Sequence, residues 1–443
     1  MANGMRIPTQ ADLMSMWNAS GLKEKLIFTF AMIVLFRLGI QLPVYGINSE
    51  VLNIAGRGDI LGFLDLFSGG ALGRVSIFAL GIGPYITSSI IMQLMTVIIP
   101  PLEKLQKEEG EAGRRKLSQY TRIFTVVLAS FQAIMLMTYL AHVPGAIAVQ
   151  NHAMFFMSSV LSLTAGSVLV MWLSELITEK GIGNGGSLII FAGILAGIPL
   201  YASTTAPIVA NDPAKMFGLI ALLAIFFVTM IFIVIMQEAI RKVIIVNPKR
   251  QIGNKVYGGV NTFIPFKLNP GGVMPIIFAV AILLFPQTIL SLLTETKIIT
   301  GAASGVVATL TSLLSPSGGV YYVLYFVMIV LLTFFYASIM PNMQPKEIAD
   351  NLKKYGSSIP GIKPGKPTAD ALDKILTKTT FIGAFALGII ALVPAFASYL
   401  TKITTLQGIG ATSLIIMVGV ALDLINQVKT HLLARNYESF LKE

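Results

Sequence analysis

The sequence predicts an all-α membrane protein with ten transmembrane helices. Hydrophobic residues make up 55% of the chain and charged residues 12%, whereas soluble domains carry about a quarter charged residues. The mean hydropathy is +0.78. Two uncharged windows, Met216–Met236 and Val320–Met340, are 21 residues long, and each exceeds the roughly 18 apolar residues that indicate a membrane span.

Ten apolar segments are long enough to cross a bilayer. In chain order they are Leu22–Leu42, Val75–Ile99, Thr121–Ala141, Ala153–Leu173, Gly185–Tyr201, Lys215–Met236, Gly272–Leu293, Val320–Met340, Lys378–Leu400 and Gly408–Val428. The mixed, polar start "MANGMRIPTQADLMSMWNASGLKEKL" has no pattern of a cleavable signal, so we expect the N-terminus to be retained.

An apolar stretch between the first two spans is too short to be a span itself. From Ile60 to Leu72 a helix rises only about 20 Å, against a hydrocarbon core of roughly 30 Å. The stretch carries Asp65, ends in a cluster of glycines and stops at Arg74. This pattern predicts half a span that enters the bilayer and returns.

The basic residues predict the orientation of the chain. With the N-terminus inside, 26 of the 32 Lys and Arg residues fall on the cytoplasmic side and five fall outside. Positively charged loops stay on the cytoplasmic side, so both termini are predicted to be cytoplasmic. Arg37 alone lies within a span, about 18 Å from Lys25 by helical rise. Two interpretations stay open for Arg37, snorkelling to the interface or bonding to a neighbouring loop.

Ten spans divide into two sets of five, residues 1–210 and residues 211–443. Because five is odd, consecutive halves must lie in opposite orientations, as in membrane proteins with inverted repeats. No clear sequence repeat supports this division. In the second half, the cytoplasmic loops 241–267 and 341–377 are long, basic and rich in Gly and Pro. Either the positive-inside bias alone explains them, or they serve as a docking surface.

No catalytic or metal-binding pattern emerges. The chain has no cysteine and three histidines, no two of which share a short motif. We therefore expect neither an enzyme nor a bound cofactor or metal. Glu175, Glu238 and Asp423 sit near the cytoplasmic ends of their spans, which gives an ion-coupled solute carrier little support. Aliphatic pairs such as Ile82 and Ile86 share a helical face, and lipid contact or helix packing explains most such pairs.

Six motifs together closely resemble the SecY family, the central subunits of the bacterial protein-translocation channel. They are "FSGGALGRVSIFALGIGPYI", "KEEGEAGRRKLSQYTR", "WLSELITEKGIGNGGS", "NPGGVMPIIFA", "ADNLKKYGSSIPGIKPGKPT" and "YESFLK". The resemblance runs from about residue 15 to the C-terminus. It implies an hourglass channel between two inverted five-helix halves, closed by a re-entrant plug helix at 59–73. It also implies residence in the bacterial cytoplasmic (inner) membrane.

The resemblance further implies four groups of site residues. The pore ring is Ile82, Ile86, Gly186, Ile190, Ile277 and Ile416; the plug includes Phe63, Leu64, Asp65, Leu66, Phe67, Ser68, Gly69 and Gly70; the lateral gate includes Thr87, Gln93, Gln132 and Gln287; the docking contacts are Arg250, Lys255, Lys353, Lys354 and Lys363. Gly186 stands where the family usually has a bulky aliphatic residue, and Lys363 where it usually has Arg. We expect Asp65 to face water and the plug glycines to act as a hinge.

Partners also follow from the resemblance. They are the small membrane subunits SecE and SecG, the motor ATPase SecA, the ribosome held through ribosomal RNA phosphates, unfolded preproteins with their signal sequences, and membrane lipid. Three alternatives remain beside a polypeptide channel with a mobile plug. They are an ion-coupled solute carrier, an intramembrane enzyme, and a channel-like protein in which segment 59–73 is a fixed structural loop.

Overall fold

The computed structural model describes residues 21–47, 65, 68–107, 109–143, 145–147, 149, 151–212, 214–252, 255–258, 262–295, 302–314, 318–339, 344–401 and 411–440. The chain divides into two compact units. Unit 1 comprises Met1–Thr204, Glu295–Ile298 and Ile416–Glu443, and unit 2 comprises Thr205–Thr294 and Ile299–Ile415.

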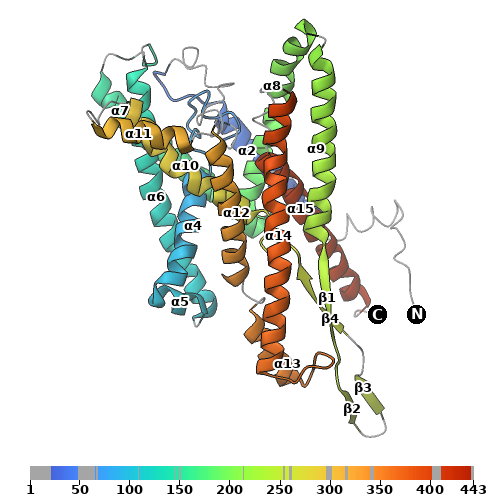
Figure 1. Ribbon diagram of the computed structural model, residues 1–443. Coiled ribbons are helices and arrows are strands. Elements are labelled where there is room, and N and C mark those ends of the chain that lie inside the picture. The colour runs from blue at the N-terminus through green and yellow to red at the C-terminus, as the bar shows by residue number, and fades with distance from the viewer. Residues whose placement is uncertain are drawn as a thin grey trace. The chain divides into compact units, whose positions relative to one another are not determined.

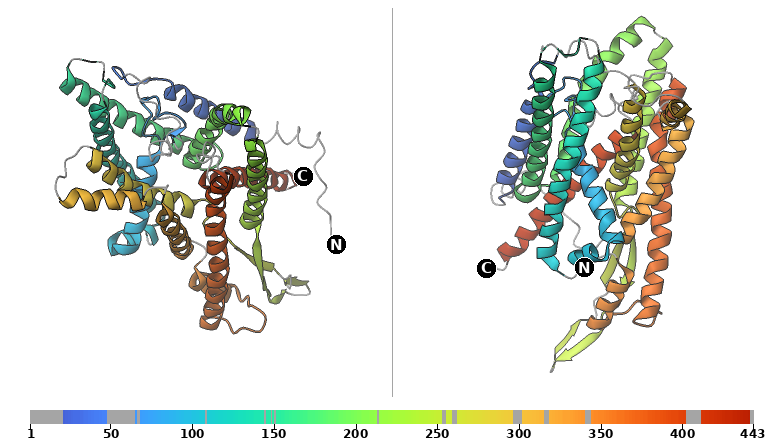
Figure 2. Two further views of the ribbon diagram at one scale, coloured as in Figure 1. Left: turned by 45° about the horizontal axis from the view of Figure 1, so that its top comes forward. Right: turned by 90° about the vertical axis from the view of Figure 1, so that its left-hand side faces the viewer.

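Unit 1 is built from helices that pack around α7. Its helices are α2 (Leu22–Ile40), α4 (Gly83–Ile98), α5 (Pro100–Lys107), α6 (Gly110–His142), α7 (His152–Lys180), most of α8 (Gly185–Asn211) and most of α15 (Ala411–Phe440). Helix α7 packs against both α2 and α6, as Figure 2 shows, and α4 packs against α6 and α7. Gly166 permits close packing on α7, because a Cβ there would lie 2.0 Å from the carbonyl oxygen of Ile77.

Unit 2 has α14 at its centre. Its helices are α9 (Ala214–Glu238), α10 (Met274–Glu295), α11 (Ala302–Leu314), α12 (Gly319–Ile339), α13 (Pro345–Tyr355) and α14 (Lys366–Thr401). Helix α14 packs against α9 and α12 (Figure 1). Gly388 lets the two helices α14 and α12 approach closely, since a Cβ there would lie 2.6 Å from the ring of Phe326.

Seven helices in the described ranges are long and apolar enough to cross a membrane. They lie in α6, α7, α8, α9, α12, α14 and α15, and so match seven of the ten predicted spans. The bent pair α4 and α5, with 106° between its helices, could form one more span. The predicted first, second and seventh spans contain helices α2, α4 and α10, but none of these meets the same criteria alone. The structure therefore supports a multi-pass helical fold rather than a count of ten.

The all-α prediction is wrong for the loop 241–267, which forms two antiparallel β-ribbons. Strand β1 (Ile240–Ile245) pairs with β4 (Thr262–Lys267), and β2 (Lys249–Ile252) pairs with β3 (Lys255–Gly258). The sequences "IRKVII" and "TFIPFK" are rich in β-branched and aromatic residues, which favour strands. Val243 and Ile245 point into unit 2, while their neighbours are exposed.

Candidate functional site

The predicted second span begins as a helix only at Gly83, and residues 69–82 form buried turns. Ala71 and Val75 are fully buried, and Val75 has a φ of 42°, which β-branched residues rarely adopt. The carbonyl of Val75 accepts a hydrogen bond of 3.0 Å from the backbone N–H of Val44. Irregular backbone is tolerated at membrane depth where protein surrounds it. The predicted boundary at Val75 is therefore corrected to Gly83.

Helix α2 and the residues just after it hold the later part of these turns. The rings of Phe36 and Phe78 stack with their centroids 6.0 Å apart. Gly39 makes room for this stack, because a Cβ there would lie 2.0 Å from the Phe78 ring. The N–H of Ile77 donates to the carbonyl of Leu42 at 3.0 Å. These contacts fix residues 75–78 against the C-terminal end of α2.

Arg37 bonds to a neighbouring loop, which decides between the two interpretations that its sequence position left open. Its Nη1 donates a hydrogen bond of 2.9 Å to the carbonyl of Gly69. Gly69 has a left-handed φ of 71°, and a Cβ there would lie 2.8 Å from the Cα of Gly193 on α8. Glycine is thus required at position 69 both by its backbone conformation and by the approach of α8.

Asp65 is buried, and the expectation that it faces water is wrong. The residue is 7% exposed, and its Oδ1 accepts a hydrogen bond of 2.6 Å from the N–H of Gly73. The Ser68 hydroxyl and the Gly70 N–H each donate to the Asp65 carbonyl at 2.9 Å. Local backbone donors therefore take the place that water was expected to fill.

The predicted plug residues Phe63, Leu64, Leu66 and Phe67 lie outside the described residues. The described part, Asp65 with residues 68–73, is called the plug base below. Its glycines cap and close a turn, since Gly69 and Gly70 both have positive φ and Gly70 bonds back to Asp65. A hinge at these glycines stays a prediction.

Four of the predicted ring residues lie in unit 1 on α4 and α8. Ile82 caps the N-terminus of α4 and is 2% exposed, and Ile190 on α8 is 1% exposed. The N–H of Ile86 donates to the carbonyl of Ile82 at 3.1 Å. A Cβ on Gly186 would lie 3.4 Å from the Cδ1 of Ile82, so the structure brings these two positions into contact.

The other two ring candidates are buried on other helices. Ile277 lies on α10 and is 4% exposed, and Ile416 lies on α15 and is fully buried. Because Ile277 belongs to unit 2, closure of the ring stays a prediction.

The glycine-rich turn Gly181–Ser187, which carries ring position Gly186, joins four helices. The N–H of Ile182 bonds to Thr29 on α2, that of Gly183 to Gln427 on α15, and that of Gly185 to Thr178 on α7. A Cβ on Gly185 would lie 1.9 Å from the carbonyl oxygen of Ser174. Sequence reasoning treated this turn as a weak signal and missed the polar residues that satisfy its backbone.

The gate candidates differ in how their polar groups are satisfied. Thr87 donates to the carbonyl of Gly83, and Gln93 donates to the Ser89 hydroxyl, so both bonds stay within α4. Gln132 is half-buried on α6. Gln287 on α10 is fully buried, and neither its Oε1 nor its Nε2 has a hydrogen-bond partner in the part of the chain that the structure describes.

The two loops that the sequence separates form one body in unit 2, which we name the loop platform. It comprises the β1–β4 ribbon, α13, residues 356–365 and the start of α14. Val246 and Ser358 exchange backbone hydrogen bonds of 2.9 and 3.1 Å, and Ser357 donates to the Asn247 side chain at 2.7 Å. Its apolar core consists of Val243, Phe266, Ile359, Leu372 and Leu376. Sequence reasoning gave the two loops but not their association.

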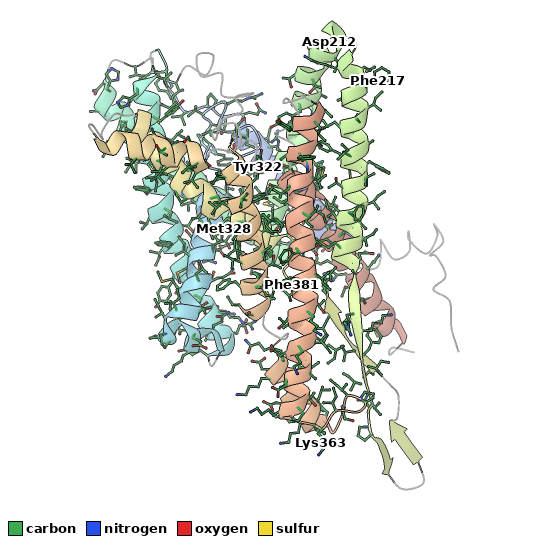
Figure 3. All side chains as sticks on the ribbon, viewed as in Figure 1. Asp212, Phe217, Tyr322, Met328, Lys363 and Phe381 are labelled. Carbon is green, nitrogen blue, oxygen red and sulfur yellow. The ribbon has the colours of Figure 1, made fainter. Side chains whose placement is uncertain are left out.

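Basic side chains cover the loop platform. Lys353 and Lys354 are exposed in the last turn of α13, where the helix dipole favours cations, and Gly356 ends the helix in the left-handed conformation. Lys363 is exposed at the end of unit 2 that lies opposite Asp212 (Figure 3). In the β2–β3 ribbon Arg250 lies opposite Tyr257 and Lys255 lies opposite Ile252.

Comparison with known proteins identifies a family. The SecY family model matches residues 76–425. The protein translocase subunit SecY of Synechococcus elongatus is 41% identical over 452 residues and covers 100% of both chains. A solved SecY protein is 18% identical to this chain, with a TM-score of 0.65, and the match covers 93% of this chain and 92% of that chain. The plug domain of that SecY protein is described as stabilising the closed state of its translocation channel and maintaining a membrane seal. The Sec61 chain of the canine ribosome–channel complex from the endoplasmic reticulum is also 18% identical, with a TM-score of 0.62 and the same coverage.

Proposed function

This chain belongs to the SecY family, and on that premise we propose that it is a protein-conducting channel of the bacterial cytoplasmic membrane. It moves unfolded secretory polypeptides across the membrane and releases membrane helices sideways into lipid. The observation that carries the proposal is the largely buried, non-helical segment 69–82, which ends at the aliphatic position Ile82. Irregular backbone at membrane depth is tolerated where protein buries it or where it lines a water-filled cavity, and a channel with a plug offers both.

The ring forms the seal of the channel. Ile82, Ile86, Ile190, Ile277 and Ile416 offer no ion ligand, and a narrow aliphatic constriction excludes water when it is empty. Aliphatic side chains also deform around any side chain of a passing polypeptide. Gly186 contributes no side chain to this ring and so weakens it locally, although the Ile82 side chain lies next to the position that a Cβ of residue 186 would take.

Segment 59–73 acts as the plug above the ring. Asp65 and Gly73 close its base through a hydrogen bond, so the base behaves as a preformed piece. A plug held by packing and a few hydrogen bonds can stay seated at rest and still be displaced by an entering chain. The proposed alternative is a loop that never moves.

Gln287 supports a gate on α10. A buried amide without hydrogen-bond partners costs about 1–3 kcal/mol for each unsatisfied group. The described residues around Gln287 offer no hydrogen-bond partner to its side chain. Opening this helix face to a polar path or to a passing chain would relieve that cost. Thr87, Gln93 and Gln132 supply the facing polar positions of the proposed gate.

The loop platform is the proposed docking surface for SecA and for the ribosome. Its exposed Lys353, Lys354 and Lys363 suit acidic protein surfaces and RNA phosphates, because such contacts need charge rather than sequence readout. The termini are cytoplasmic, on the same side as the loop platform, and SecE and SecG complete the assembly.

A stalled secretory chain tests the proposal. The chain lacks cysteine, so Ile86→Cys gives a single thiol at the ring, and Ile123→Cys, at a position 64% exposed on α6, gives a matched control. In proteoliposomes supplied with SecA, ATP and SecE, the stalled chain should crosslink to the thiol at position 86 and not to that at position 123. The reverse pattern would reject a central pore, and uptake of a small solute without partners would favour the carrier.

A further inference from the structure

We propose that Arg37 is a positioning residue that holds the plug base in the closed channel through its hydrogen bond to the Gly69 carbonyl. The inference rests on the proposed function, because it concerns how that channel stays shut. It assigns a role to the lone charged residue that the sequence places deep within a span.

The cost of Arg37 within a span requires a compensating contact. A charged side chain at that depth is expensive and normally pairs with another charge or with backbone carbonyls. Among the residues that the structure describes, no carboxylate lies within ion-pair distance of Arg37. Its recorded partner is the Gly69 carbonyl, at 2.9 Å. Hydrogen bonds from a charged donor are roughly twice as strong as neutral ones.

The plug base is a self-contained turn. The Gly73 N–H bonds to the Asp65 carboxylate, the Gly70 N–H bonds to the Asp65 carbonyl, and the Leu72 N–H bonds to the Ser68 hydroxyl. These bonds shape the base but attach it to no other element. The Arg37 bond is the one side-chain hydrogen bond recorded between α2 and the described part of the base.

The backbone just after the base has its own contacts with α2 and the residues that follow α2. Val75 and Ile77 bond to Val44 and Leu42 after α2, and Phe78 stacks on Phe36. Val75 has the positive φ of 42°, a strained conformation for a β-branched residue. After loss of the Arg37 bond, two backbone hydrogen bonds of 2.9 Å would still join the base to these residues, from the Val75 N–H to the Leu72 carbonyl and from the Ser76 N–H to the Ala71 carbonyl. Displacement of the base would break these two bonds as well, with the pivot at Arg74–Val75.

The test combines a buried thiol with charge-removing variants. Ala71 is fully buried in the base, so Ala71→Cys supplies a unique thiol whose reaction with a membrane-impermeant maleimide reports exposure of the base. Arg37→Met keeps the side-chain length and removes the donors. Arg37→Lys keeps a charged donor. Arg74→Met removes a neighbouring cation whose recorded partner is the Gln41 side chain.

In proteoliposomes of the parent with Ala71→Cys, labelling should be slow and the resting conductance small. Arg37→Met should raise the labelling rate about tenfold or more, since loss of a charged hydrogen bond shifts an equilibrium by that order. The resting conductance should rise in parallel. Arg37→Lys should fall between parent and Arg37→Met, and Arg74→Met should have a clearly smaller effect because its pair is exposed.

Equal labelling and conductance in parent and Arg37→Met would overturn the proposal. Equal increases for Arg37→Met and Arg74→Met would also overturn it, because charge near the base rather than the bond to Gly69 would then matter. If Arg37→Met does not fold, the comparison of Arg37→Lys with the parent decides. No increase in labelling rate or conductance for Arg37→Lys would then count against the proposal. SecA-driven translocation by the parent tests the channel function separately. If the parent translocates and Arg37→Met changes neither labelling nor conductance, only the proposed role of Arg37 is rejected, and the channel function stands.

Discussion

The hydroxyl of Thr29 on α2 accepts a hydrogen bond of 3.1 Å from the backbone N–H of Ile182, 153 residues further along the chain. The same hydroxyl donates to the carbonyl of Lys25 at 2.8 Å. A Cβ on Gly181 would lie 2.4 Å from this oxygen, so the turn meets α2 without any side chain between them. One hydroxyl of the first helix therefore holds the turn from which α8 carries Gly186 and Ile190.

Replacing Thr29 with Val should destabilise the protein. The side chain keeps its shape, but the buried N–H of Ile182 loses its acceptor, which costs about 1–3 kcal/mol. Thermal unfolding in detergent should show a lower midpoint for Thr29→Val and a nearly unchanged one for Thr29→Ser, which retains the hydroxyl. Equal midpoints for both variants would mean that the hydrogen bond does not hold the turn.

The neighbouring glycines 185 and 186 should respond differently to alanine. A Cβ on Gly185 would lie 1.9 Å from the Ser174 carbonyl oxygen, so Gly185→Ala must push α8 away from α7. On Gly186, the nearest atom would be 3.3 Å away and belongs to the Asn184 side chain. Overpacking a close contact typically costs about 1–3 kcal/mol, so the unfolding midpoint should fall for Gly185→Ala alone. A larger loss for Gly186→Ala than for Gly185→Ala would contradict the close packing of Gly185 against α7.

The sequence placed most helices but not the contacts between distant segments. Apolar length is a local property, so seven of the ten predicted spans match long apolar helices in the described ranges. Apolar length cannot distinguish a buried turn from a helix, and for this reason Val75–Ile82 was assigned to a span. Asp65 was expected in water because nothing in its neighbours shows that the Gly73 N–H folds back onto it.

Long-range partners were also beyond the sequence. Arg37 was an evident anomaly, yet Gly69 could not be chosen as its partner without the fold. The two loops of the loop platform were recognised by charge and length, whereas the bond between Ser357 and Asn247 joins residues 110 positions apart. The β1–β4 ribbon was missed because each of its two strands is only six residues long.

Polar substitutions in the ring should make the resting channel leak ions. Ile86→Ser and Ile190→Ser each place a hydroxyl where an aliphatic group excludes water, and wetting removes the barrier to ions. Closed-channel conductance in planar bilayers should therefore rise in both variants. Ile189→Ser is the matched control, since Ile189 is as buried as Ile190 but is not a ring position. A leak in the control alone, or unchanged conductance in both ring variants, would show that the ring residues are wrongly assigned.

Charge reversal at Lys363 should weaken the action of SecA on the channel without unfolding the protein. Lys363 is exposed on the loop platform. Thr368 donates a hydrogen bond of 2.8 Å to the backbone carbonyl of Lys363, so a substitution of the side chain leaves this bond in place. An exposed substitution of this kind changes stability by no more than about 0.5 kcal/mol. Lys363→Glu should therefore lower SecA-stimulated translocation several-fold at low salt, because like charges across an interface slow association.

High salt should narrow this difference, since exposed ion pairs are screened over about 8 Å at physiological ionic strength and over less at higher salt. Lys363→Arg should retain activity, because the charge remains and a bidentate donor is added. Lys215→Glu is the matched control. The Lys215 side chain is 41% exposed and pairs with Asp212 at 3.8 Å, at the opposite end of unit 2 from Lys363 (Figure 3). Equal SecA stimulation in vesicles carrying the parent and Lys363→Glu would remove Lys363 from the interface. An equal loss in Lys215→Glu would indicate a general effect of charge rather than docking on the loop platform.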